Sequence, residues 1–274
     1  MADNPQPWSW GDSTTVELSS IGPSDVGLLP VGATEQHGPH LPTSTDTVIA
    51  ERLCRLAAAS APAVVLPPVA IGASYGHGYA LPGTLAVSPE VLAGLVRSIV
   101  LWAHRTTGLS RFIVLNAHVG NGAALDVATD HLRLDHPEVR TAVRDWARLV
   151  PDLEPELSAD GADWHANRAE TSMMLALAPE LVRTDRMAGA DDPDRTADLV
   201  FRYTATSLST NGVTGEPSTA SVELGRRLVE RTVAALADLV RRASTEEPPL
   251  IDHRPRGAAP RPADTPSQET TWTP

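Results

Sequence analysis

Residues 26–46 read VGLLPVGATEQHGPHLPTSTD, and they join an apolar run to a cluster of polar side chains. The run from Val26 to Val31 is typical of a buried strand in a parallel sheet. Four side chains that can bind a cation follow it: Glu35, His37, His40 and Asp46. Carboxylate and imidazole groups placed after a buried strand predict a metal site at the strand end, although a solvated polar loop has the same composition.

Apolar runs and helical spacing alternate along the rest of the chain. Further strands are predicted at Val64–Ile71 and Arg111–Leu115, and a weaker one at Val139–Trp146. Helices are predicted at Thr47–Ala59, Pro89–Thr106, Gly122–Leu134, Ala166–Leu177 and Ser218–Arg242. This alternation predicts an α/β fold with three layers, α/β/α, around a central and mostly parallel sheet. Ligands of such folds bind at the carboxyl ends of the strands.

Composition indicates one domain followed by a tail. Residues 1–244 are predicted to form the α/β domain. Residues 245–274 are rich in proline and lack an apolar period, which predicts a disordered tail. Within the helix predicted at Pro89–Thr106, Leu95, Ile99 and Trp102 share helical spacing, so we expect them in the core.

Composition also excludes several classes of protein. Cys54 is the only cysteine, which rules out an internal disulfide framework and a thiolate-rich metal site. The 22 basic residues are all arginines, so Schiff-base chemistry and a P-loop lysine are both excluded. A formal net charge of −12 would repel a polyanion, and no nucleic-acid partner is expected.

Two features predict a soluble cytoplasmic protein without a membrane partner. The sequence begins MADNPQPWSW, which lacks the basic region and apolar run of an export signal. The longest apolar stretch, Val91 to Trp102, contains Arg97 and is too short to cross a bilayer.

A second polar cluster follows the strand predicted at Arg111–Leu115. Its residues 116–121 read NAHVGN and precede a predicted helix, so His118 emerges at a strand end. The free N–H groups of a helix amino terminus lie nearby and can hold an anion. Asn121 fits a helix N-cap as well as a role in the site, and both interpretations stay open.

A third cluster, residues 163–172 with the sequence DWHANRAETS, opens another predicted helix. His165 and Glu170 lie more than one turn apart, which favours different roles for the two side chains. A glutamate in a first helical turn is also stabilised by the helix dipole, without any further function.

The three clusters together resemble the creatininase family of metal-dependent amidohydrolases. The first matches that family's opening signature from Val31 to Pro42 and again at Thr45–Thr47. The later pieces follow in the family's order: Leu81–Thr84, Asn-x-His-x-Gly-Asn at 116–121, and His-Ala-x-x-x-Glu-Thr-Ser at 165–172. The resemblance spans roughly residues 24–240 and implies a creatininase-like fold.

The resemblance implies two divalent metal ions per chain. Glu35 and His118 would bind one ion, His37 would bind the other, and Asp46 would bridge them. Oxygen and imidazole ligands suit zinc, manganese or iron. Two cations that share a carboxylate can hold a water between them and lower its pKa toward neutrality.

The resemblance also implies a fourth carboxylate and a proton carrier. In creatininase the acid lies two residues after the motif histidine, where this chain has Gly120. Glu170 is the candidate that replaces it, as a ligand and as a catalytic residue. His165 matches the histidine that moves protons in the family, and it would protonate the leaving nitrogen. The expected activity is hydrolysis of a non-polymeric or terminal amide bond.

Departures from the family's motifs bear on the substrate. Side chains at Ala117, Val119 and Asn167 replace glycines of relatives, which argues against creatinine. We expect a small-molecule or short-peptide amide from a specialised-metabolite or peptide-derived cofactor pathway. Candidate substrate-binding residues are Tyr75, His77, Tyr79, Val119 and Trp164, of which Trp164 fits a packing role equally well. The family also implies a homo-oligomer, namely a hexamer.

Three alternatives remain. Residues 72–76 read GASYG and fit the Gly-x-Ser-x-Gly elbow of a serine hydrolase with Ser74 as nucleophile, but the glycines and proline that follow prevent the helix that the elbow needs. The substitutions at Ala117, Val119 and Asn167 also permit a metal-free binding protein that keeps the fold. An amide-forming enzyme would use the same core.

Overall fold

A computed structural model describes residues 8–249, and it confirms the predicted α/β architecture. All five strands lie parallel in one sheet with the order β1-β3-β2-β4-β5. Their bounds are β1 Trp8–Ser9, β2 Val26–Val31, β3 Ala63–Val65, β4 Arg111–Asn116 and β5 Arg140–Asp145. The chain turns back across β2 when it passes from β3 to β4, so the point where strand order reverses lies between β2 and β4. Ligands of open α/β sheets bind at that point.

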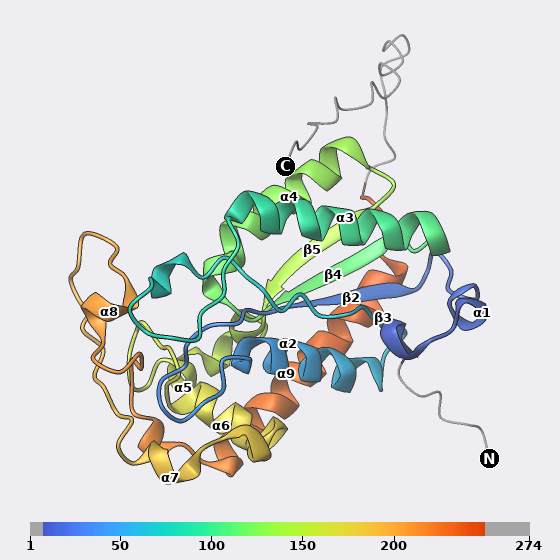
Figure 1. Ribbon diagram of the computed structural model, residues 1–274. Coiled ribbons are helices and arrows are strands. Elements are labelled where there is room, and N and C mark those ends of the chain that lie inside the picture. The colour runs from blue at the N-terminus through green and yellow to red at the C-terminus, as the bar shows by residue number, and fades with distance from the viewer. Residues whose placement is uncertain (1–7, 250–274) are drawn as a thin grey trace.

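Helices cover both faces of the sheet and complete the three layers. In Figure 1, α3 and α4 lie on one face, and α2 and α9 lie on the other, where α9 also packs against α6. The helices are α1 Thr15–Leu18, α2 Thr45–Ala58, α3 Pro89–Thr107, α4 Gly122–Asp135, α5 Glu154–Leu157, α6 Arg168–Leu177, α7 Thr184–Met187, α8 Ala205–Leu208 and α9 Val222–Thr245.

The side chains of the central strands alternate between two cores. Leu28 and Leu115 belong to the core shared with α2, α6 and α9. Leu29 and Val114, their neighbours in sequence, belong to the core under α3 and α4. Successive strand residues point to opposite faces, and β2 is buried along its whole length. A strand buried on both faces therefore carries the site at its end.

Two details of the sequence-based fold were wrong. The strand predicted at Val64–Ile71 ends at Val65, because Pro67 and Pro68 interrupt the ladder. Beyond it, Leu66 N–H donates to Leu28 O, and an isolated parallel bridge joins Val69 to Val31. The two-residue strand β1 was not predicted, since so short a segment carries no alternation.

Helix α3 is apolar on two sides, and this misled the prediction of its core face. Its buried face consists of Leu92, Ala93, Val96, Val100 and Ala103. Leu95 and Trp102, which we expected in the core, are exposed, while Ile99 is partly buried. Helical spacing alone could not separate the two apolar stripes.

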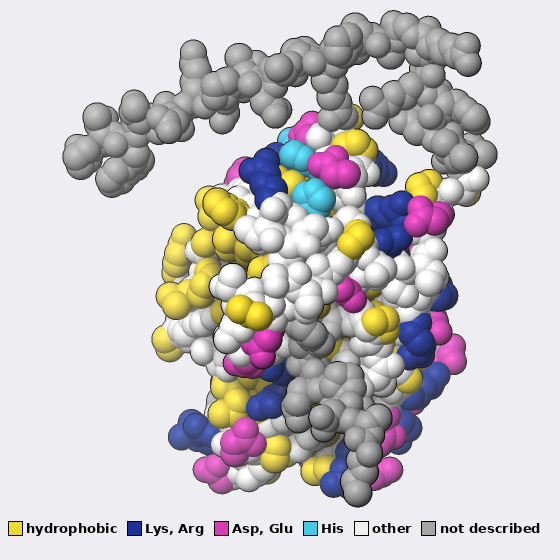
Figure 2. Space-filling model, turned by 90° about the vertical axis from the view of Figure 1, so that its right-hand side faces the viewer, with side chains coloured by type: hydrophobic (Ala, Val, Ile, Leu, Met, Phe, Trp, Pro, Cys, Tyr) yellow, Lys and Arg dark blue, Asp and Glu magenta, His cyan; other side chains and the backbone are white. Residues whose placement is uncertain are grey.

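The remaining predictions concern the end of the chain and membranes. Helix α9 ends at Thr245, and the tail predicted at 245–274 lies outside the described residues from 250 onward. Among residues 8–249, no helix has both the length and the apolar character to cross a bilayer. Figure 2 shows apolar side chains gathered along one edge of the face in view and charged ones spread over the rest.

Candidate metal centre

The carboxyl ends of β2 and β4 bring the first two polar clusters together. Glu35 follows β2 and His118 follows β4, and the two strands pair along their full length up to Val31 and Asn116. His118 Nδ1 lies 3.1 Å from Glu35 Oε2. Residues 83 positions apart in the sequence thus meet where the order of the strands reverses.

Asp46 joins this pair from the first turn of α2. One of its oxygens, Oδ2, lies 3.5 Å from His118 Nδ1, and the other, Oδ1, lies 3.2 Å from His37 Nε2. Each oxygen of a single buried carboxylate therefore faces a different imidazole. A carboxylate that bridges two cations has this arrangement.

Three groups of side chains are close enough to hold one cation each, and two of them consist mostly of buried residues. Glu35, Asp46 and His118 form the first, with all three ligand atoms within 4.8 Å of one another. His37, Glu170 and His165 form the second. We call the five buried residues Glu35, His37, Asp46, His118 and Glu170 the floor of the site.

The hydrogen bonds of His37 show why the floor fits a cation. Its Nδ1 lies 3.2 Å from the main-chain oxygen of Glu35, which can only accept, so Nδ1 carries the proton. Nε2 is then a lone pair that faces Asp46 Oδ1. Neither His37 Nε2 nor Asp46 Oδ2 makes a hydrogen bond. Buried acceptors that face one another need a proton or a cation between them.

Burial and neighbouring charges separate the pKa values of the floor carboxyls. Burial and the charge of Glu35 raise the pKa of Asp46 well above its usual value. Burial alone would raise the pKa of Glu35, but His118 and His77 more than offset it and hold that pKa well below the usual value. Burial raises the pKa of Glu170 to about 8 despite nearby His37. A cation would displace the protons that the raised pKa values leave on Asp46 and Glu170.

Asparagine side chains hold the loop that carries His118. Asn116 Oδ1 accepts from His118 N–H at 3.2 Å, and its Nδ2 donates to His118 O at 2.8 Å. Asn121 donates from Nδ2 to Gly32 O at 3.0 Å and accepts from Ala73 N–H at 2.9 Å. Asn121 occupies the N-cap position of α4, but its side chain makes no capping hydrogen bond and ties three segments together instead.

Ser74 contacts His118 but does not form the elbow of a serine hydrolase. Its hydroxyl lies 3.3 Å from His118 Nε2, and the side chain is buried. Only a short 3₁₀ turn, Tyr75–His77, follows it, where a nucleophile elbow needs a helix. If the hydroxyl accepts from the Nε2–H of His118, then Nδ1 of that ring is a lone pair that can bind a cation. Metal-bound histidines usually donate their other ring N–H to an acceptor in this way.

The third cluster is held by a tight turn at the start of α6. Asn167 caps α6 by accepting from Ala169 N–H and Glu170 N–H. Its amide also donates to Leu157 O and Asp160 Oδ1. The side chain that replaces a glycine of relatives is thus fully used in structure and says little about substrate.

Glu170 is held by the same turn. Ala166 adopts a φ of 51°, and its N–H donates to Glu170 Oε2 at 2.6 Å. Strained backbone of this kind is typical of functional sites, because the surrounding structure must stabilise it.

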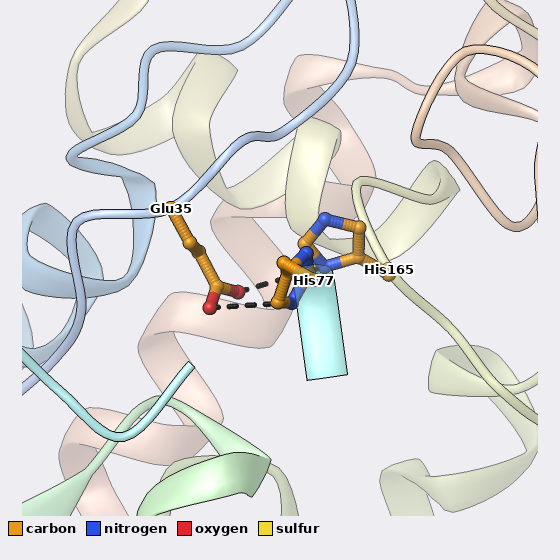
Figure 3. Close-up of side chains that lie close together, drawn as sticks. All are labelled: Glu35, His77 and His165. Carbon is orange, nitrogen blue, oxygen red and sulfur yellow. Dashed lines mark ion pairs between the residues drawn. The ribbon is translucent and has the colours of Figure 1, made fainter. Parts of the chain in front are cut away.

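His77 and His165 lie beside Glu35, as Figure 3 shows. His77 Nε2 is 3.2 Å from Glu35 Oε2, and His165 Nδ1 is 3.8 Å from Glu35 Oε1. Burial, His37 and His77 lower the pKa of His165 well below its usual value, so its ring is neutral at neutral pH. The sequence singled out His77 only as a substrate contact, and its ion pair with Glu35 was missed.

His40, the remaining histidine of the first motif, serves a different purpose. Its Nε2 lies 2.8 Å from Thr171 Oγ1 on α6, and its main-chain oxygen accepts from Arg183 N–H. Burial and His37 lower its pKa to about 4. His40 therefore ties the first motif to α6, which carries Glu170.

The other substrate-binding candidates differ in their surroundings. Tyr75, Tyr79 and Val119 are exposed, and we call them the apolar border. Residues 119–120 lie next to Ala73, because a Cβ on Gly120 would approach Ala73 O to 2.7 Å. Trp164 is partly buried, and its ring packs edge-on against Trp146 with 5.8 Å between centroids. Its role in substrate binding stays a prediction.

Comparison with known proteins agrees with this geometry. The family model described as creatinine amidohydrolase matches residues 12–240. A mycofactocin precursor peptide peptidase from Mycolicibacterium smegmatis is 36% identical over 245 residues, covering 86% of this chain and 92% of that protein. The creatinine amidohydrolase of Pseudomonas putida is 31% identical over 233 residues, covering 79% and 88%.

Solved structures agree as well. A manganese form of creatininase and a mutant creatininase of the zinc–zinc type superpose with TM-scores of 0.72 and 0.73. Both are 27% identical to this chain and cover 87% of it, and the match covers 99% and 98% of their own chains. The match of the family model over residues 12–240, together with relatives that are more than 30% identical over most of the chain, shows that the chain belongs to the creatininase family.

Proposed function

We propose that this chain is a metal-dependent amidohydrolase that uses two divalent cations to cleave an amide C–N bond. The observation that carries the proposal is Asp46, whose two oxygens face His118 and His37 in separate clusters. Glu35 and His118 would hold the first cation, His37 and Glu170 the second, and Asp46 both. Zinc and manganese are the proposed ions, because creatininases with those names share the fold.

Two cations held in this way would polarise the amide carbonyl and activate a water for attack. The chain's own residues supply the remaining steps. His165 belongs to the second cluster and its Nδ1 lies 3.8 Å from Glu35 Oε1, so a neutral His165 can accept a proton and deliver it to the leaving nitrogen. The hydrogen bond from Ala166 N–H to Glu170 Oε2 holds Glu170 in place beside His37.

The substrate that we propose is a peptide amide in the maturation of a peptide-derived cofactor. Relatives called mycofactocin precursor peptide peptidase support this choice. The exposed border also suits it, since Tyr75 and Tyr79 lie near an exposed apolar segment that contains Phe201 and Tyr203. Thr204 adjoins Gly78, which places the two segments side by side. Exposed aromatic side chains offer a large contact area to a peptide chain.

A hydrolysis assay tests the proposal. The purified chain is stripped with a chelator, reloaded with zinc or manganese, and incubated with a synthetic mycofactocin precursor peptide or with creatinine. We expect peptide cleavage, seen by mass spectrometry, only in the reloaded protein. Ser74→Ala should retain metal-dependent cleavage. Activity that survives complete metal removal and is lost in Ser74→Ala would instead establish the serine hydrolase.

The same assay separates the other two alternatives. A metal-free binding protein would take up no zinc and cleave nothing. An amide-forming enzyme would join the two product fragments faster than it releases them from the precursor.

We further propose a homo-oligomer in which α3 contributes to the contact between copies. Val91, Leu95 and Trp102 form an exposed apolar stripe along that helix, on the side away from its buried face. Exposed apolar stripes of this kind mark protein interfaces. Light scattering should show a hexamer, and Trp102→Glu should shift it to a smaller species. A monomer in the unmodified protein would contradict the assignment.

A further inference from the structure

Gln36, which stands between the floor residues Glu35 and His37, has an amide whose orientation is determined on both sides. Its Oε1 accepts from Gly38 N–H at 3.1 Å, and its Nε2 donates to Gly212 O at 3.0 Å. A main-chain N–H can only donate and a main-chain oxygen can only accept. The reverse orientation would set donor against donor and acceptor against acceptor. Nε2 therefore points toward Gly212 and keeps one further N–H to donate.

The tautomer of His165 follows from its own contact with Gln36. His165 Nε2 lies 2.8 Å from the main-chain oxygen of Gln36, so it must carry a proton and donate it. Although Gln36 Nε2 is also 3.1 Å from His165 Nε2, two donors cannot bond to each other. In the neutral ring the other nitrogen, Nδ1, is consequently a lone pair, and it faces the floor of the site.

The tautomer of His77 follows from Gln36 as well, but the nitrogen that His77 turns toward the floor carries a proton. The remaining N–H of Gln36 has one acceptor within reach, His77 Nδ1 at 3.1 Å. Because Nδ1 accepts, the proton of the neutral ring lies on Nε2, 3.2 Å from Glu35 Oε2. His77 therefore presents an N–H toward the floor, whereas His165 presents a lone pair. Figure 3 shows both rings directed at the same carboxylate.

We propose that Gln36 fixes these two imidazoles in complementary states, so that His77 is a catalytic hydrogen-bond donor to the substrate's carbonyl oxygen while His165 is the proton acceptor. The proposal rests on the proposed hydrolase function. The Nε2–H of His77 is directed at the floor, where the cations would be held, and could donate there to the oxygen on which negative charge develops. A donor placed there before the reaction stabilises that charge without reorganisation. Gln36 is then a positioning residue, which acts through His77.

The same argument bears on a third possible cation position. Glu35, His77 and His165 lie close enough together to bind an ion. A metal ligand must offer a lone pair, however, and the amide of Gln36 holds the proton of His77 on the nitrogen that faces Glu35. This group is thus a hydrogen-bonding arrangement, and two ions per chain are expected.

Nitrogen-15 NMR of histidine tautomers tests the arrangement without reference to turnover. In the full chain, metal-free and zinc-loaded, His77 and His165 should both show the Nε2–H tautomer. In Gln36→Met, His77 should become a mixture of tautomers, whereas His165 should keep Nε2–H, because its acceptor is main chain. A general loss of structure would alter both rings. Exposed His131 provides the control through His131→Asn, which should change neither signal.

Kinetics with the precursor peptide supply the second test. His77→Phe should lower kcat roughly 100-fold, with KM and the content of two zinc ions unchanged, as expected for loss of one transition-state donor. His77→Gln, which can place an amide N–H at the same position, should recover a large part of that loss. Gln36→Met should lower kcat in parallel with the tautomer change.

Two results would overturn the inference. One is an Nδ1–H tautomer at His77 in the unmodified protein, and the other is a third zinc ion per chain that disappears in His77→Phe. The tautomers are measured on the protein alone. A chain that cleaves no peptide but shows the expected NMR signals would therefore refute the proposed function and leave the role of Gln36 intact.

Discussion

The floor and the apolar border lie within a few residues of each other in the sequence, yet they differ in burial and in the ionisable character of their side chains. The floor residues are buried and ionisable, and they lie on or directly after four elements: β2, α2, β4 and α6. Tyr75, Tyr79 and Val119 of the border are exposed. The floor residues belong to the motifs that resemble the family, whereas Val119, one of the three departures from those motifs, belongs to the border. We therefore expect chemistry and substrate choice to be carried by separate parts of one site.

We expect the largest effect from a substitution of Asp46, the proposed ligand that both cations share. Asp46→Asn should abolish hydrolysis and reduce metal content from two ions toward none, because the substitution weakens both clusters at once. Elemental analysis and the peptide assay measure the two outcomes. Asp130→Asn, at an exposed position on α4, is the control and should retain both metal and activity. Full activity in Asp46→Asn would refute the two-cation site.

A smaller effect comes from the glycine beside His118. A Cβ on Gly120 would lie 2.3 Å from His118 Nε2, so Gly120→Ala must displace the imidazole or the loop. Displaced metal ligands typically cost about 10–100-fold in affinity, and a zinc competition titration should show a loss of that size. Gly122→Ala is the matched control, since a Cβ there meets nothing within 4 Å. Equal affinities for the two variants would contradict the proposed contact.

The protonation of Glu170 predicts a pH dependence for the second cation. Its pKa of about 8 in the metal-free protein means that the carboxyl is protonated at pH 7 and must release that proton when a cation binds. Affinity should rise about tenfold per pH unit below pH 8 and level off above it. Calorimetry in two buffers of different ionisation enthalpy counts the proton released. In Glu170→Gln this proton should be missing.

The same raised pKa affects stability in the metal-free protein. Because the folded pKa lies above that of the unfolded chain, the contribution of Glu170 to stability is fully present below about pH 4.5 and is lost as pH rises toward 8. Zinc should therefore stabilise the chain most at the upper end of this range.

The smallest effect concerns the border. Tyr79→Ala should raise KM for the precursor peptide roughly fivefold, equal to about 1 kcal/mol, while kcat and metal content stay unchanged. An exposed side chain contributes uniform binding and no transition-state contact. A fall in kcat at constant KM would place Tyr79 in the chemistry and remove the distinction between floor and border.

The fold and the floor were predictable because each rests on local patterns. Val26–Val31 carries an uninterrupted apolar run, and β2 has the predicted bounds. Glu35, His37 and Asp46 belong to one continuous motif, so they could be identified together. The clustering of His118 and Glu170 with them required only that parallel strands end at one edge of the sheet.

The role of Gln36 could not be predicted in the same way. Its amide is oriented by Gly212, which is 176 positions away in the sequence, on a segment without motif or periodicity. The same is true of the bond between Ser74 and His118, which spans 44 positions. Such contacts depend on how loops fold against one another, and no residue pattern records that.

The packing of α9 against α6 has a consequence for the order in which the protein matures. Glu35, Asp46 and His118 all precede residue 119, so the ligands of the first cation leave the ribosome early. Glu170 lies on α6, where Ser172 Oγ accepts from Ser221 N–H at the start of α9. Helix α9 also packs against α2, which carries Asp46, so residues of both cation positions rest on the last helix to be synthesised. We therefore expect both ions to be bound only after translation has ended.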